Sequence, residues 1–145
     1  MLNPGDPAPP FEAQDHLGNR VTLDDFKGKK LVLWFYPKAD TPGCTAEGCS
    51  FRDLSDDFAQ KNAAIVGVSF DTPEENKAFA EKYGFSFPLL SDTSRQLGVA
   101  YGAADDTSAS NAKRIGVVID EAGKILAYYP AVDAKTFPAE VVQTL

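Results

Sequence analysis

The segment best suited to chemistry is Thr41-Pro42-Gly43-Cys44, which follows a run of apolar residues and contains one of the chain's two cysteines. Threonine is a good helix N-cap, and proline is well tolerated at the next position, where its missing N–H costs nothing. Cys44 then falls in the first helical turn, among free backbone N–H groups at the positive end of the helix dipole. Such a position favours the thiolate form of cysteine, so the segment predicts a reactive sulfur that Gly43 leaves open to a small substrate.

The second cysteine, Cys49, lies five residues further along the same predicted helix. In an intact helix that spacing corresponds to about 140° around the axis and a Cα separation of roughly 8–9 Å, beyond the ~7 Å limit for a disulfide. A Cys44–Cys49 bridge would therefore require the helix start to unwind, and Gly48 makes unwinding easier by roughly 0.5–1 kcal/mol relative to alanine. The spacing alone also allows two unrelated cysteines, with Cys49 as buried filler.

The surrounding pattern predicts alternating strands and helices. An unbroken apolar run over residues 31–36 is typical of a strand buried on both faces, with Trp34, Phe35 and Tyr36 as core or pocket wall. Thr72 and Glu75 form a capping-box pattern ahead of a helix that ends near Gly84. The other expected elements are a hairpin around 15–23, a helix over 42–62, strands over 64–70, 87–90, 115–120 and 125–129, a short helix over 92–97, a surface loop over 101–113 and a helix over 134–144. This order predicts an α/β fold with a mixed sheet.

Length and charge limit the possible functions. A chain of 145 residues is typical of one domain, which we expect to span residues 1–145. The net charge of −7 argues against binding to nucleic acid or to anionic membranes. No apolar run approaches the ~20 residues of a membrane span, and the N-terminus does not resemble a signal peptide. We therefore expect a cytoplasmic protein, or an organellar one whose transit peptide has been removed.

The reactive segment and its flanks resemble a known family. The match includes Pro37, the Thr41–Thr45 segment, Glu47 and Cys49, and it is similar to the signature of the peroxiredoxins, more narrowly their bacterioferritin-comigratory-protein or PrxQ branch. The lead-in at residues 5–9, the segments 35–38 and 90–92 and the strand at 114–120 also match, so the resemblance covers nearly the whole chain. Gly116 and Val117 stand where the family more often has Thr or Ser followed by Phe, which affects the packing expected there.

The resemblance implies a thioredoxin-like α/β fold, with a central mixed β-sheet flanked by helices and an N-terminal β-hairpin. It implies that Cys44 is the peroxidatic nucleophile and Cys49 the resolving cysteine. Thr41 would hydrogen-bond the thiolate or the peroxide, Pro37 would shield the sulfenate from water, and Arg114 would reach the pocket from a neighbouring strand. Arginine suits that role because it stays charged and presents a rigid fork of donors to the peroxide oxygens.

The same resemblance implies a thiol-dependent peroxidase that acts on hydrogen peroxide and small organic hydroperoxides. The Cys44 sulfenic acid would be resolved by Cys49 as an intramolecular disulfide, which thioredoxin or a similar dithiol would reduce. No cofactor and no metal ion are expected, and the protein would be a monomer.

Two other functions remain open at this point. A thioredoxin-like disulfide oxidoreductase would carry Cys-x-x-Cys at the helix start, whereas this chain has four residues between its cysteines. A non-enzymatic thioredoxin-fold module for redox sensing or binding would not need an ionised, accessible Cys44. Among the other polar residues, we interpret His16 as a surface residue without a catalytic role and Arg52 as the partner of nearby aspartates. Glu47 either assists the site through its position near the helix start or is an ordinary acid of the first helical turn, and we favour the second interpretation.

Overall fold

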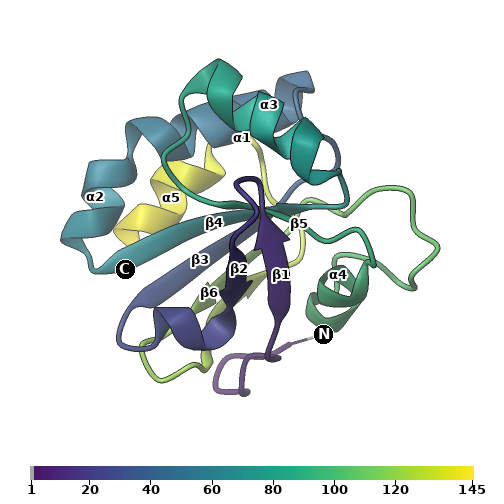
Figure 1. The fold of residues 1–145 in the computed structure, drawn as a ribbon. Coiled ribbons are helices and arrows are strands. Elements are labelled where there is room, and N and C mark those ends of the chain that lie inside the picture. Colours follow the sequence, from purple (N-terminus) through teal and green to yellow (C-terminus); the bar gives the residue numbers. More distant parts are fainter. Residues whose placement is uncertain (1) are drawn as a thin grey trace.

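The computed structural model describes residues 2–145, which form one mixed sheet with helices on both faces (Figure 1). Seven strands run in the order β2-β1-β5-β4-β3-β6-β7. The strands are β1 (Glu12–Asp15), β2 (Arg20–Thr22), β3 (Lys30–Phe35), β4 (Ala63–Ser69), β5 (Leu89–Ser91), β6 (Gly116–Ile119) and β7 (Ile125–Tyr129). The helices are the 3-10 turn η1 (Leu23–Phe26), α1 (Pro42–Asp53), α2 (Ser55–Gln60), α3 (Pro73–Tyr83), α4 (Gln96–Tyr101) and α5 (Phe137–Gln143). This arrangement confirms the predicted thioredoxin-like α/β fold.

The centre of the sheet consists of β3, β4 and β5, which pair in parallel. Leu31, Val32 and Leu33 of β3 are each 0% exposed, which explains why this strand shows no alternation of apolar and polar residues. On one side β6 pairs antiparallel with β3 and β7 pairs antiparallel with β6, and on the other side β1 of the β1–β2 hairpin pairs antiparallel with β5. The predicted N-terminal hairpin is therefore confirmed.

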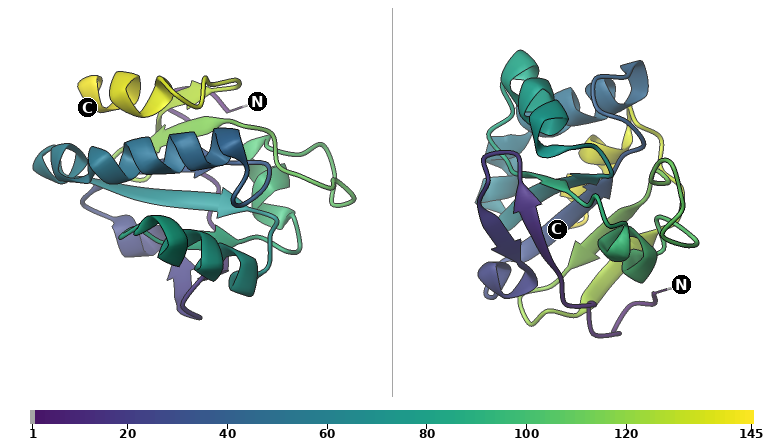
Figure 2. Two further views of the ribbon diagram at one scale, coloured as in Figure 1. Left: turned by 90° about the horizontal axis from the view of Figure 1, so that it is seen from above. Right: turned by 45° about the vertical axis from the view of Figure 1, so that its right-hand side comes forward.

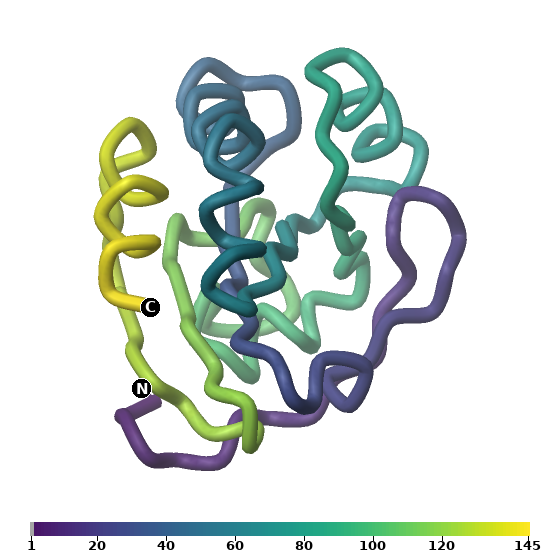
Figure 3. The backbone as a smooth tube through the Cα atoms, turned by 90° about the vertical axis from the view of Figure 1, so that its left-hand side faces the viewer, coloured from purple at the N-terminus to yellow at the C-terminus, as the bar shows by residue number. Residues whose placement is uncertain are grey.

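Helices α5, α1 with α2, and α3 lie side by side along one face of the sheet (Figures 2 and 3). Their apolar side chains, including Phe51, Phe58 and Phe79, pack in one core with Trp34 of β3 and with Tyr36, which follows that strand. The opposite face is covered by α4, η1 and the N-terminal segment, whose side chains form a second core. Because α1 follows directly after β3, its N-terminus lies at the carboxyl ends of the central parallel strands, where α/β folds commonly place reactive groups.

The capping signals of α3 are confirmed. Thr72 Oγ1 accepts the Glu75 N–H at 3.2 Å, and Glu75 Oε1 accepts the Thr72 N–H at 3.0 Å. Gly84 ends the helix in the left-handed region, with φ of +68°. Within residues 2–145, no helix is long and apolar enough to cross a membrane.

Three predicted boundaries were wrong. The helix expected over residues 42–62 is interrupted at Leu54, where neither glycine nor proline marks the break. The short helix expected from Asp92 begins instead at Gln96, with Arg95 as its N-cap, and the Asp92 carboxylate accepts the N–H groups of Leu97 and Gly98 in its first turn. The last helix begins at Phe137 rather than residue 134.

Candidate active site

Cys44 lies where the capping pattern placed it, in the first turn of α1. Thr41 is the N-cap in an extended conformation and Pro42 is the first helical residue. The first backbone bond at this end of the helix joins Thr45 N–H to Thr41 O at 2.8 Å, so the helix itself does not use the N–H groups of Gly43 and Cys44. These donors lie in the same first turn as Cys44, which is 0% exposed, and this end of the helix favours negative charge.

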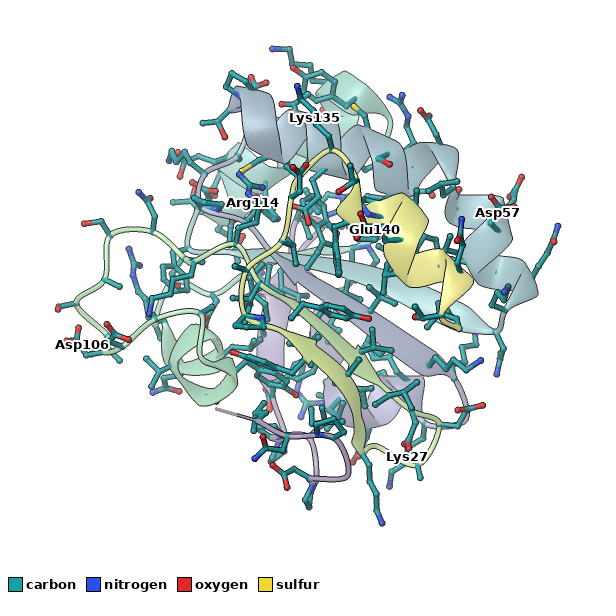
Figure 4. The ribbon with its side chains drawn as sticks, turned by 180° about the vertical axis from the view of Figure 1, so that it is seen from behind. Lys27, Asp57, Asp106, Arg114, Lys135 and Glu140 are labelled. Atoms are coloured by element: carbon teal, nitrogen blue, oxygen red, sulfur yellow. The ribbon has the colours of Figure 1, made fainter. Side chains whose placement is uncertain are left out.

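Arg114 brings a guanidinium to the same sulfur. Its Nη2 donates to Cys44 Sγ at 3.4 Å, and its Nη1 donates to Glu47 Oε1 at 2.8 Å. Figure 4 shows the Arg114 side chain reaching from the loop before β6 towards the start of α1. The antiparallel pairing of β3 with β6 brings the two together although they are 70 residues apart in sequence. Arg114 thus contacts Cys44 from the loop before β6, and the role expected for it in the reaction stays a prediction.

Gly43 is needed for this contact. A Cβ atom at this position would lie 2.9 Å from Arg114 Nη2, closer than real Cβ atoms come to their neighbours. We predicted that the missing side chain leaves room for a substrate, whereas the atom that occupies this space is a guanidinium nitrogen. The glycine therefore allows the fixed cation to come within reach of the sulfur.

The interpretation of Glu47 as an ordinary acid of the first turn was wrong. The residue lies in the second turn of α1, its side chain is 0% exposed, and its only ion pair within residues 2–145 is with Arg114. Its Oε2 has no hydrogen-bond partner there. Burial raises the pKa of the Glu47 carboxyl to about 7, against the opposing effect of the Arg114 guanidinium. Two sequence signals point to Glu47: it lies three residues after Cys44 and so on the same face of the helix, and it belongs to the segment that resembles the peroxiredoxins.

The Thr41 side chain is hydrogen-bonded to the loop before α1. Its hydroxyl donates to Lys38 O at 2.7 Å, and its side chain makes no capping bond among the described residues. A hydroxyl whose proton is held in this way directs its lone pairs elsewhere and can accept a hydrogen bond from a peroxide. Pro37 is half-buried between the end of β3 and this loop. The roles expected for Thr41 and Pro37 stay predictions.

The two cysteines both lie on the intact helix α1, and neither forms a disulfide within the described chain. Cys49 is half-buried against the core that includes Trp34 and Phe85. Gly48 has a packing role besides its flexibility, because a Cβ atom there would lie 2.5 Å from the Phe85 ring. The structure therefore shows the helical state, in which the spacing excludes a Cys44–Cys49 bridge.

Two further residues can be compared with their predictions. Arg52 pairs with Asp53, with Nε to Oδ1 at 3.0 Å, and also donates to Tyr83 O at 2.7 Å. His16 is partly buried rather than on the open surface, and its Nδ1 accepts the Leu89 N–H at 3.2 Å. Burial lowers the pKa of His16, which keeps the ring neutral for this bond. Neither contact reaches Cys44.

Comparisons with known proteins agree with this geometry. Residues 4–128 match the AhpC/TSA family. Peroxiredoxin Bcp of Bacillus subtilis is 38% identical over 97% of this chain and 93% of its own length. Peroxiredoxin Q, chloroplastic, of Sedum lineare is 40% identical over 86% of this chain and 67% of its own length. The crystal structure of peroxidoxin BcpB from Mycobacterium tuberculosis has a TM-score of 0.91 at 33% identity, covering 99% of this chain and 96% of that one.

A reactive cysteine at a helix start beside an arginine, on a thioredoxin-like fold, defines the class of protein as a peroxiredoxin. The chain belongs to the AhpC/TSA family, and its relatives are the Bcp and PrxQ peroxiredoxins. It is therefore a thiol peroxidase, and neither a disulfide oxidoreductase nor a non-enzymatic binding module is favoured.

Proposed function

We propose that this peroxiredoxin reduces hydrogen peroxide and small organic hydroperoxides at Cys44, with Cys49 as the resolving cysteine. The observation that carries the proposal is the 3.4 Å contact between Arg114 Nη2 and Cys44 Sγ at the N-terminus of α1. A solved structure that addresses the alkyl peroxide reduction activity of the Xanthomonas campestris bacterioferritin comigratory protein has a TM-score of 0.86 at 29% identity.

In the first step the Cys44 thiolate attacks one oxygen of the peroxide and the O–O bond breaks. The other oxygen leaves as water or an alcohol after taking up a proton, and Cys44 becomes a sulfenic acid. Arg114 and the free N–H groups at the helix start face the region where negative charge moves during this step, which supports their role in stabilising it. The residues beside the covered sulfur, namely Thr41, Gly43 and Arg114, are partly exposed, which supports the approach of a small peroxide on this side.

In the second step the Cys49 sulfur attacks the sulfenic sulfur, water is released and a disulfide forms. Because both cysteines are held apart on α1, this step requires the first turns of the helix to unwind. A dithiol of the thioredoxin type then reduces the disulfide by thiol exchange and is itself oxidised. The single sheet with a core on each face supports our proposal that residues 1–145 act as one domain. By analogy with the Bcp relatives we also propose that this domain is a monomer in the cytoplasm.

The test is peroxide consumption in the presence of thioredoxin, its reductase and NADPH. The unmodified protein should turn over, and Cys44→Ser should be inactive. Cys49→Ser should consume one equivalent of peroxide per chain and then stop or turn over slowly. Equal activity of Cys44→Ser and the unmodified protein would overturn the assignment of the nucleophile. Full coupled activity of Cys49→Ser would overturn only the resolving step.

A further inference from the structure

The loop between β3 and α1, residues 36–41, determines where the helix that carries Cys44 begins. At its centre the Ala39 N–H donates to Asp71 Oδ2 at 2.8 Å, and Lys38 Nζ contacts Asp71 Oδ1 at 2.7 Å. The carbonyl of Lys38 in turn accepts the Thr41 hydroxyl at 2.7 Å. The Asp71 carboxylate, which lies in the connection between β4 and α3, therefore accepts a backbone N–H two residues before the N-cap of α1.

Asp71 is itself held firmly. It lies just after β4 and is 4% exposed. Ser69 Oγ donates to Asp71 Oδ2 at 2.8 Å, and Ser69 is bonded to Asn76 within a buried polar network. Asn76 accepts the Tyr36 hydroxyl at 2.6 Å, so the network also reaches the first residue of the loop. A buried carboxylate surrounded by donors in this way has a defined position from which to hold the loop.

No neighbouring element requires the Asp71 carboxylate for its own capping or charge pairing. Helix α3 begins with its own capping box, formed by Thr72 and Glu75, so it does not require the Asp71 carboxylate. Lys38 has Glu75 as a second partner, with Nζ to Oε2 at 2.8 Å, so the lysine charge is paired without Asp71. The bond that Asp71 alone provides is the one to the Ala39 N–H.

We propose that Asp71 is a positioning residue for the peroxidatic site, acting through Ala39 and Lys38 on the Thr41 hydroxyl and the first turn of α1. This inference rests on the proposed function of Cys44. It assigns to Asp71 the placement of groups that meet the peroxide, and not the ionisation of the sulfur, which Arg114 already contacts directly. Misplacement of such groups by about 1 Å can lower a rate on the order of 100-fold.

The test compares two reactions of the same thiol in Asp71→Ala: the single-turnover rate with hydrogen peroxide and the alkylation rate with iodoacetamide. We expect the peroxide rate to fall about 10- to 100-fold and the alkylation rate to change by less than about threefold. Asp71→Asn keeps an oxygen that can accept the Ala39 N–H, and it should restore the peroxide rate to within about threefold of the unmodified protein. The Ala39 amide should exchange with deuterium faster in Asp71→Ala than in Asp71→Asn.

Ile125→Val is the matched control, because it loosens the core of β7 at the opposite end of the sheet and leaves both rates unchanged. If Asp71→Ala does not fold, Asp71→Ser replaces it, since its shorter side chain falls short of the Ala39 N–H. An unchanged peroxide rate, or an equal fall in both rates, would overturn the proposal for Asp71. Failure of the proposed function is a different result, namely unmodified protein whose Cys44 does not react with peroxide.

Discussion

Replacement of Glu47 by glutamine tests the buried ion pair behind the reactive sulfur. The carboxyl is 0% exposed, and its burial raises its pKa from 4.5 to about 7 despite the contact with Arg114. Between these two values the folded protein holds a proton that the unfolded chain has released. The free energy of unfolding should therefore fall as pH rises from about 4.5 to 7 and should level off above that.

The size of the effect follows from the difference in pKa. Each pKa unit corresponds to about 1.4 kcal/mol, so this one carboxyl accounts for a loss of about 3 kcal/mol across the window. With a urea dependence of about 2 kcal/mol per molar, the midpoint of unfolding should move down by about 1.5 M from this group alone. Glu47→Gln has no proton to release and should lack this component.

The assay is urea unfolding of the reduced protein at pH 4.5 and pH 7.5. Subtracting the pH dependence of Glu47→Gln from that of the unmodified protein removes the contribution of other groups, such as Asp92, whose pKa is also raised by burial. Glu140→Gln, on the exposed face of α5, serves as the control and should keep the full dependence of the unmodified protein. If Glu47→Gln and the unmodified protein lose the same stability across this range, the reasoning about Glu47 is refuted.

Three other changes follow from the same contacts. Arg114→Lys should lower kcat/KM for peroxide about 10- to 100-fold in steady-state assays, because a single ammonium group cannot contact Cys44 and Glu47 at once as the two guanidinium nitrogens do. A loss below twofold would contradict this prediction. Gly43→Ala should lower peroxide reactivity in single-turnover assays, because its Cβ atom displaces Arg114 Nη2. Thermal melting should show no loss of stability, because alanine favours the helix. Unchanged reactivity would show that the guanidinium contact is dispensable. Gly48→Ala should destabilise the reduced protein by about 1–3 kcal/mol in urea unfolding, because its Cβ meets Phe85, and a stability equal to the unmodified protein would exclude that clash.

The local geometry of the site could be predicted because it depends on neighbours in sequence. Thr41, Pro42 and Cys44 lie within one turn, and capping preferences alone place the sulfur at the helix start. The contact with Arg114 could not be derived from spacing, because it depends on the pairing of β3 with β6, and only the resemblance to the peroxiredoxins pointed to it.

Burial was the harder property to predict. An acid within a helix is usually exposed, so nothing in the local pattern of Glu47 indicated complete burial against Arg114. The contact of Asp71 with the loop before α1 was also not predicted, because the capping box of Thr72 and Glu75 already explained the polar residues next to it. The break at Leu54 has no glycine or proline to mark it. The burial of Glu47 against Arg114 and the bond of Asp71 to Ala39 both depend on contacts between segments far apart in the chain.

The most direct test of the central claim is mass spectrometry of the reduced protein after one equivalent of hydrogen peroxide. Our account predicts a Cys44–Cys49 disulfide within a single chain, and in Cys49→Ser a Cys44 sulfenic acid that a dimedone probe captures. It also predicts that this oxidation is much slower in Arg114→Lys. A Cys44 that remains a reduced thiol while peroxide persists would contradict the account.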